Sequence, residues 1–138
     1  MIRNRRLNIN AIVLLLAVLI LAISCCTSKE VKVVASVNGS LVELKKGQTL
    51  VITLESNPTT GYQWEVIENE ESVLQQKGKA EFKSSNTGNP PSSGKSGTET
   101  FRFYAQSPGN GNLKLVYHRP WEKEVEPLKT FTIKVKVR

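Results

Sequence analysis

The chain has 138 residues, 39% of them hydrophobic, which suits one globular domain of ordinary size. Its formal net charge is +7, but three of the 19 basic residues lie in the first ten positions, so 16 basic residues stand against 12 acidic ones in the remainder. These 16 are scattered and form no block of five or six, which argues against nucleic-acid binding. With one histidine and two adjacent cysteines, the composition also argues against a histidine or cysteine metal site, and we expect no metal and no cofactor.

The N-terminal segment has the pattern of an export signal. Arg3, Arg5 and Arg6 precede the unbroken apolar run Ala11–Ile23, and small polar residues follow it. This order of basic start, apolar run and small residues is typical of secretory signals. The run is short for a membrane span, which needs about 20 apolar residues. An uncleaved N-terminal anchor is the alternative, because no A-x-A cleavage site is evident.

The end of this segment, "LAISCC", resembles a bacterial lipoprotein signal, in which small residues precede a cysteine that becomes the lipidated first residue. Cys25 fits that position, with Cys26 as the alternative. We therefore expect a signal peptide over residues 1–24, a short linker over 25–30 and a single domain over 31–138. We expect the protein to be exported and anchored by lipid to the cell envelope, on the periplasmic or extracellular face.

From Val31 onward the hydrophobic residues alternate with a period of two, which is typical of strands with one buried face. Asn38-Gly39 favours a two-residue type I′ hairpin, because both of its central positions need positive φ. Lys46-Gly47 separates the next two strands. Later runs continue the alternation, and the residues expected on one face are Leu50, Ile52, Leu54, Tyr62, Trp64, Val66, Phe101, Phe103, Ala105, Leu113, Leu115, Tyr117, Phe131, Ile133, Val135 and Val137.

These short strands, separated by Gly, Pro and Asn, predict an all-β fold, an immunoglobulin-like antiparallel β-sandwich. One stretch lacks the alternation. Lys83–Gly97 is rich in Ser, Gly, Asn and Pro, cannot bury a face, and is expected to be a mobile surface loop.

The sequence offers little that would support catalysis. The body of the chain has no thiol, and its single histidine, His118, is expected at the surface at the end of a strand. The glutamates between Glu68 and Glu71 and between Glu122 and Glu126 lie in polar stretches and are expected to be solvated. The "GNPPSSGKS" stretch has one residue too many for a phosphate-binding loop. We therefore expect a binding protein and not an enzyme.

Three loop motifs occur in order along the strands. The first is Asn57-Pro58-Thr59-Thr60-Gly61-Tyr62, the second is Gly94-Lys95-Ser96-Gly97, and the third is Arg119-Pro120-Trp121. Taken singly, each is an ordinary turn or packing element: Arg119 could lay its stem on Trp121, and Trp64 belongs to the core. Together, in this order, they resemble the chagasin family of inhibitors of papain-like cysteine peptidases, over roughly Val31 to Arg138.

The resemblance implies a reversible, tight-binding inhibitor that presents three loops at one end of a sandwich as a wedge for the peptidase cleft. It implies that Asn57–Tyr62 covers the catalytic cysteine and histidine, that Gly94–Gly97 lies along the non-primed side, and that Arg119 and Trp121 engage the primed side. Pro58 and Gly61 would stiffen the first loop, and Trp121 would be a large apolar anchor. We expect a monomer.

One alternative stays open from the residues alone. The domain could be a cell-surface immunoglobulin-like binding module for a carbohydrate or for another protein. In that case the Asn57–Tyr62 and Arg119–Trp121 motifs would not be needed together for contact with a peptidase.

Overall fold

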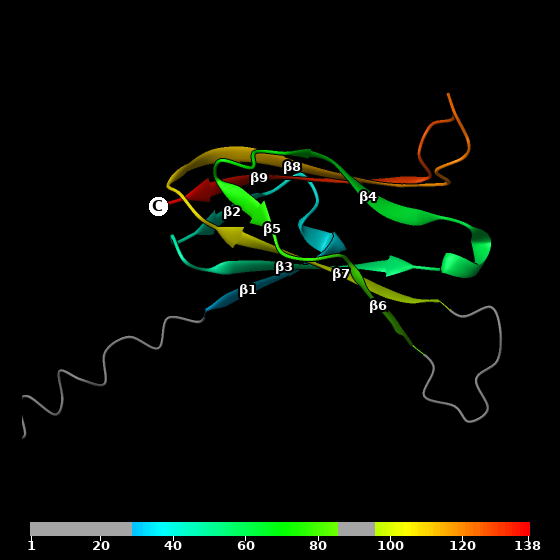
Figure 1. The fold of residues 1–138 in the computed structure, drawn as a ribbon, viewed down its shortest axis with the longest axis horizontal. Coiled ribbons are helices and arrows are strands. Elements are labelled where there is room, and N and C mark those ends of the chain that lie inside the picture. Colours follow the sequence, from blue (N-terminus) through cyan, green and yellow to red (C-terminus); the bar gives the residue numbers. More distant parts are fainter. Residues whose placement is uncertain (1–28, 86–95) are drawn as a thin grey trace, which may run out of the picture.

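A computed structural model describes residues 29–85 and 96–138, so the expected signal peptide, the lipidation candidates Cys25 and Cys26, and residues 86–95 lie outside the described residues. The described chain forms a two-layer β-sandwich, which confirms the predicted fold class (Figure 1). The described residues contain no α-helix; two short 3₁₀ turns, η1 (Ala35–Val37) and η2 (Pro58–Thr60), lie between strands.

The first sheet has five strands in the order β1-β3-β7-β5, with β6 also paired to β7. Its strands are β1 (Glu30–Val34), β3 (Thr49–Ser56), β5 (Leu74–Gln76), β6 (Glu81–Ser84) and β7 (Gly97–Ala105). The second sheet has the order β2-β9-β8-β4. Its strands are β2 (Leu41–Leu44), β4 (Gln63–Asn69), β8 (Gly109–His118) and β9 (Lys129–Val137). β1 begins at Glu30, the last residue of the expected linker.

The core lies between the two sheets and consists mainly of residues that the alternation placed on one face, together with Val33, Val42, Leu44, Val73 and Leu74. Leu50, Ile52 and Leu54 of β3 are at most 1% exposed, and they face the inward residues of β8 and β9. Tyr62 and Val66 are only partly buried and pack at the margin of this core. With no cysteine after Cys26, burial of these apolar side chains is the main source of stability for the domain.

The prediction of a hairpin at Asn38-Gly39 is wrong. β1 and β2 lie in different sheets, where β1 pairs in parallel with β3 and β2 pairs in parallel with β9. Asn38 has φ −52° and ψ 132°, Gly39 has φ 80°, and Ser40 donates its N–H to the oxygen of Val37 at 3.0 Å. These are type II turn angles, which need positive φ at the second central residue only. The turn carries the chain from one sheet to the other and does not reverse it within one sheet.

The boundaries predicted for the long loop are also corrected. Lys83 and Ser84 lie in β6, and Gly97 begins β7, because the two segments pair from Glu81 opposite Thr100 to Ser84 opposite Gly97. The first and last residues of the expected loop are therefore paired strand residues, although "KSSN" lacks the hydrophobic alternation of a strand. Serine and lysine occupy this edge because only backbone groups make the pairing.

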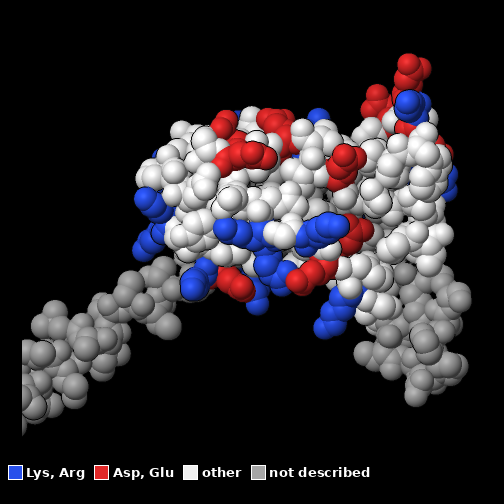
Figure 2. Space-filling model, in the orientation of Figure 1, with Lys and Arg blue, Asp and Glu red and all other residues white. Residues whose placement is uncertain are grey.

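Charges on the face shown in Figure 2 are mixed, with basic and acidic side chains interspersed. Within residues 29–85 and 96–138, no group of three or more His, Cys, Asp or Glu side chains is arranged so that it could hold a metal ion. The part of the chain that the structure describes has no helix with the length and apolar character needed to cross a bilayer.

Candidate functional site

Two connections and the described ends of a third, Ser85 and Ser96, meet at one end of the sandwich, which we call the loop end (Figure 1). The central loop, Asn57–Tyr62, joins β3 of the first sheet to β4 of the second. The β6–β7 connection belongs to the first sheet and the β8–β9 connection belongs to the second. The central loop thus lies between the β8–β9 connection of the second sheet and the ends of β6 and β7 in the first, while the C-terminus lies at the opposite end (Figure 1).

The central loop is closed by hydrogen bonds within itself. Thr60 N–H donates to the oxygen of Asn57 at 3.2 Å, and Gly61 N–H donates to the oxygen of Pro58 at 3.0 Å. Thr59 Oγ1 donates to Asn57 Oδ1 and Thr60 Oγ1 donates to the oxygen of Asn57, both at 2.6 Å. Gly61 has φ 81°, a left-handed conformation that glycine adopts without strain. The threonine hydroxyls are therefore used to close the loop, and each keeps an oxygen lone pair that can accept from a partner.

Both bases of the central loop are fixed to the two sheets. Asn57 N–H donates to the hydroxyl of Tyr117, on β8, at 2.8 Å. One residue earlier, Ser56 Oγ donates to the carboxylate of Glu99, and both side chains are buried. On the other side of the loop Trp64 is 8% exposed and donates Nε1–H to the oxygen of Glu55 at 2.9 Å. The expectation that Trp64 belongs to the core is confirmed.

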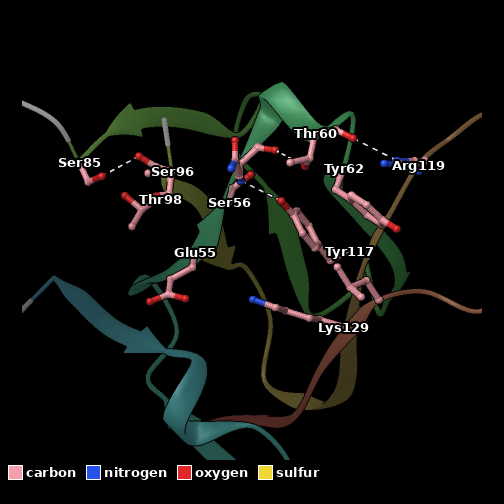
Figure 3. Close-up of a pocket in the computed structure, with 13 residues that line it drawn as sticks. Glu55, Ser56, Thr60, Tyr62, Ser85, Ser96, Thr98, Tyr117, Arg119 and Lys129 are labelled. Carbon is pink, nitrogen blue, oxygen red and sulfur yellow. Dashed lines mark hydrogen bonds between the residues drawn. The ribbon is translucent and has the colours of Figure 1, made fainter. Parts of the chain in front are cut away.

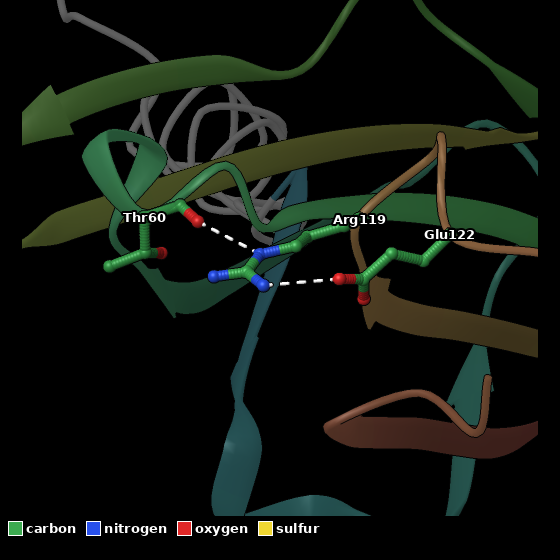
Figure 4. A network of polar contacts seen from close by, with 3 residues as sticks. All are labelled: Thr60, Arg119 and Glu122. Carbon is green, nitrogen blue, oxygen red and sulfur yellow. Dashed lines mark hydrogen bonds and ion pairs between the residues drawn. The ribbon is translucent and has the colours of Figure 1, made fainter.

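Arg119 makes its contacts within the protein, on the central loop and on its own turn. Its Nε donates to the oxygen of Thr60 at 3.0 Å, and its guanidinium carbon lies 4.5 Å from the centre of the Tyr62 ring. Its Nη1 donates to Oε1 of Glu122 at 3.1 Å (Figure 4). The first and third motifs are thereby brought into direct contact.

Trp121 combines high exposure with contact to the central loop. Its side chain is 66% exposed, yet its indole lies so close to Gly61 that an added Cβ there would fall 2.4 Å from Cη2 of Trp121. Pro120 is exposed beside it. An exposed indole against a rigid backbone is a preformed apolar surface, which is the form that anchors of protein interfaces take.

The second motif is described only at its C-terminal half, because Gly94 and Lys95 lie outside the described residues. Ser96 is exposed, and its backbone oxygen accepts from Ser85 N–H at 3.1 Å and from Ser85 Oγ at 2.6 Å. Gly97 is buried, and an added Cβ would lie 2.2 Å from the backbone oxygen of Lys83. Gly97 is therefore required by the pairing of β6 with β7, whatever else the motif does.

A cleft of about 550 Å³ opens between the central loop, the described ends of the β6–β7 connection and the β8–β9 connection (Figure 3). Tyr62 and Tyr117 line it on the second sheet, Ser56 and Gly97 line it on the first, and Leu128 lines it from the end of the β8–β9 connection. The motif residues that line this cleft are Asn57, Thr60, Tyr62, Ser96, Gly97 and Arg119. The other described motif residues, Pro58, Thr59, Gly61, Pro120 and Trp121, do not line it. The structure thus brings the described parts of the three motifs to one end of the molecule.

Sequence reasoning missed three residues that shape this end. Glu99 lies on the same face of β7 as Phe101 and Phe103. An acidic residue at an inward position was therefore a sign, visible in the sequence, of a buried polar contact. Tyr117 was placed on the inward face, but the partner of its hydroxyl was not foreseeable. Glu122 was assigned to a solvated stretch, whereas it is only partly exposed and pairs with Arg119. His118 ends β8, and its Nε2 lies 2.5 Å from Oε2 of Glu65.

Comparison with known proteins matches residues 43–135 to the family model described as Chagasin family peptidase inhibitor I42. Chagasin of Trypanosoma cruzi is 32% identical over 108 residues, covering 76% of this chain and 96% of chagasin. A crystal structure of EhICP2, a cysteine protease inhibitor from Entamoeba histolytica, has a TM-score of 0.67 at 23% identity, covering 79% of this chain and 95% of that one. PbICP-C, solved in complex with falcipain-2, has a TM-score of 0.57 at 18% identity, covering 80% and 100%. The two structural likenesses establish the shared fold.

Proposed function

Because the chain belongs to the chagasin family of cysteine peptidase inhibitors, whose members are inhibitors and not enzymes, we propose that it blocks papain-like peptidases with the loop end of its sandwich. PbICP-C, which shares the fold, was solved with falcipain-2, and this supports a papain-like partner for the present chain. Binding is reversible and leaves the inhibitor uncleaved.

The observation that carries this proposal is the rigidity of the central loop. Four hydrogen bonds close Asn57–Gly61 on itself, and Tyr117 and Arg119 hold it from outside. A loop that is ordered before binding loses little conformational entropy in the complex, so more of its contact energy appears as affinity. A short protruding loop of this kind suits an active-site cleft, which is concave.

The proposed assignment of contacts follows the order of the connections. The central loop, Asn57–Tyr62, covers the catalytic cysteine and histidine of the peptidase. The β6–β7 connection, with Gly94–Gly97, lies on the non-primed side, and the β8–β9 connection, with Arg119, Pro120 and Trp121, lies on the primed side. The described residues form one hydrophobic core, and charges of both signs are interspersed on the face shown in Figure 2. Both features suit a monomer that contacts its peptidase through the loop end.

A direct assay tests the proposal. The purified full-length protein is mixed at micromolar concentration with papain and with several other papain-like peptidases, and hydrolysis of a small fluorogenic substrate is followed. We expect stoichiometric, reversible loss of peptidase activity. If none of the peptidases is inhibited, the proposed function is wrong, and a surface-binding role for a carbohydrate or another protein becomes the better explanation.

We also propose export and lipid anchoring at Cys25, at the cell envelope. The geometry of the fold is compatible with such an anchor. Glu30 of β1 pairs with Thr49 at the start of β3, whereas the central loop follows Ser56 at the end of β3. Seven steps of about 3.3 Å separate these points by roughly 23 Å. A membrane attached ahead of β1 would therefore leave the loop end free.

The two adjacent cysteines provide a matched test of the anchor. In bacterial cells that make the protein, Cys25→Ser should abolish incorporation of labelled palmitate and release the protein from the membrane fraction, while Cys26→Ser should leave both unchanged. Equal labelling of both variants would refute anchoring at Cys25.

A further inference from the structure

We propose that Glu122 is a positioning residue of the inhibitor: it fixes the Arg119 guanidinium, and Arg119 in turn holds the central loop in its inhibitory shape. This inference rests on the proposed function of the loop end. It assigns to Arg119 an internal role in addition to the contact that the family resemblance implies, and it assigns a role to Glu122, which lies outside the three motifs.

Arg119 is surrounded on three sides by groups of the protein. Nε donates to the oxygen of Thr60 at 3.0 Å, and Nη1 donates to Oε1 of Glu122 at 3.1 Å (Figure 4). On the third side, the guanidinium carbon lies over the Tyr62 ring, 4.5 Å from its centre. An arginine side chain carries five N–H donors, and at least two of them are used here. Fewer donors remain for a peptidase than an extended arginine would offer.

Glu122 is itself held in place by the turn that carries it. Its backbone N–H donates to the oxygen of Arg119 at 3.0 Å, so the carboxylate returns to the guanidinium three residues back. The side chains of Arg119 and Glu122 are 34% and 31% exposed, so the pair is partly shielded from solvent. Such a charge-assisted hydrogen bond limits the rotation of a side chain that otherwise has many rotamers.

The same turn contacts the central loop at two adjacent residues. Arg119 holds the oxygen of Thr60, and Trp121 lies against Gly61. Two of the four hydrogen bonds that close the loop are donated by the backbone N–H groups of Thr60 and Gly61. If Glu122 is removed, the guanidinium gains rotational freedom, the Thr60 contact weakens, and the two amides should open more often.

The experiment compares Glu122→Ala, Glu122→Gln, Arg119→Ala and the double variant in the full-length protein. Hydrogen exchange of the Thr60 and Gly61 amides is measured in the free protein, and the inhibition constant is measured against papain. Because a partly exposed charged pair is worth about 1 kcal/mol, we expect about fivefold faster exchange at the two amides and about fivefold weaker inhibition for Glu122→Ala. Glu122→Gln, which keeps an acceptor oxygen, should recover part of both.

Two further readouts separate this role from general destabilisation and from direct contact. Core amides of β8 and β9 should exchange at wild-type rates, and Glu126→Ala, which removes the same charge from the same connection, should change neither quantity. The double variant should match Arg119→Ala, because Glu122 acts through Arg119. Unchanged loop exchange in Glu122→Ala, or additive effects in the double variant, would overturn the proposal. If the wild-type protein inhibits no peptidase, the proposed function fails, while the exchange data still decide the role of Glu122.

Discussion

Trp121 is the most exposed large apolar side chain of the described residues, and its position explains how one residue can matter for binding without mattering for folding. Its side chain is 66% exposed to solvent, and its indole packs against Gly61. In the proposed complex the peptidase would bury this surface, so we expect the residue to contribute to binding and to add little to the stability of the free domain.

Replacing Trp121 with Ala should therefore weaken inhibition and spare the fold. A buried tryptophan anchor is worth about 2–4 kcal/mol, so we expect the inhibition constant for papain to rise by about 30- to 1,000-fold. The free energy of unfolding in urea should change by less than about 0.5 kcal/mol. Leu41→Ala, which truncates an exposed apolar side chain on β2, is the control for loss of apolar surface and should change neither quantity. An inhibition constant within twofold of wild type would remove Trp121 from the contact surface.

Tyr117 has the opposite character, because it is 5% exposed and acts on the central loop from beneath. Its ring packs against Tyr62 and Trp64 with centroid distances of 5.4 and 5.1 Å, and only its hydroxyl reaches Asn57. Tyr117→Phe keeps the packing and removes the acceptor. The Asn57 N–H, which is partly buried, would then lack its partner, at a cost of about 1–3 kcal/mol.

For Tyr117→Phe we expect lower stability by about 1 kcal/mol in urea unfolding and about tenfold weaker inhibition of papain, since the loop loses one of its external contacts. Tyr104→Phe, on β7 and away from the loop end, is the matched control and should change neither value. Inhibition at wild-type strength by Tyr117→Phe would show that the loop keeps its shape without this hydrogen bond.

Among the elements, the ladder between β6 and β7 is the one whose sequence is least strand-like. Its closest approach is at Gly97, where the backbone oxygen of Lys83 and the ring of Phe82 leave no room for a Cβ. The ladder therefore needs glycine at Gly97 for reasons of packing, independently of any contact with a peptidase.

Gly97→Ala should force β6 away from β7. We expect a loss of about 1–3 kcal/mol in the free energy of unfolding, with increased amide exchange in β6. Ser96→Ala keeps the backbone oxygen that Ser85 uses, so it should retain wild-type stability. If Gly97→Ala has wild-type stability but weaker inhibition, its role is contact with the peptidase and the packing argument is wrong.

The sequence predicted which side chains of each strand face the core better than it predicted which strands pair with one another. Period-two alternation placed Leu50, Ile52 and Leu54 inward because it depends only on residues close in the chain. It could not place β2 beside β9, since their pairing joins Val42 to Val135. A turn dipeptide such as Asn38-Gly39 specifies a change of direction, and which sheet receives the next strand depends on packing of the whole domain.

The candidate site follows the same rule. The Asn57–Tyr62 motif was identified from local residues, because Pro58 and Gly61 fix the loop through their own backbone angles. The external contacts of the loop come from Tyr117 and Arg119, about sixty residues later, and from Glu122 through Arg119. These contacts depend on the register of β4 with β8, which the sequence alone did not specify.

At the scale of the molecule, the central loop spans the two sheets and is held by both. β3 and β4 belong to different sheets. Glu99 of the first sheet binds Ser56 directly before the loop, and Tyr117 of the second sheet binds Asn57 at its start. Because both sheets hold the loop, the packed sandwich limits the motion of its six residues, Asn57–Tyr62. A loop held in this way resists being drawn into the extended form.

Because of this rigidity, we predict that the peptidase does not cleave the inhibitor. Pro58–Thr60 forms a 3₁₀ turn. The carbonyl oxygens of Asn57 and Pro58 accept from the Thr60 and Gly61 N–H groups, and that of Thr60 accepts from Arg119 Nε. Attack by a thiolate needs a carbonyl held about 3–3.5 Å away in the correct direction, and the turn would have to unfold to supply it. After prolonged incubation with papain and dissociation of the complex, mass spectrometry should recover the intact chain. Recovery of a chain cut between Asn57 and Tyr62 would mean that the loop enters the cleft as a substrate, and the wedge mechanism would then be wrong.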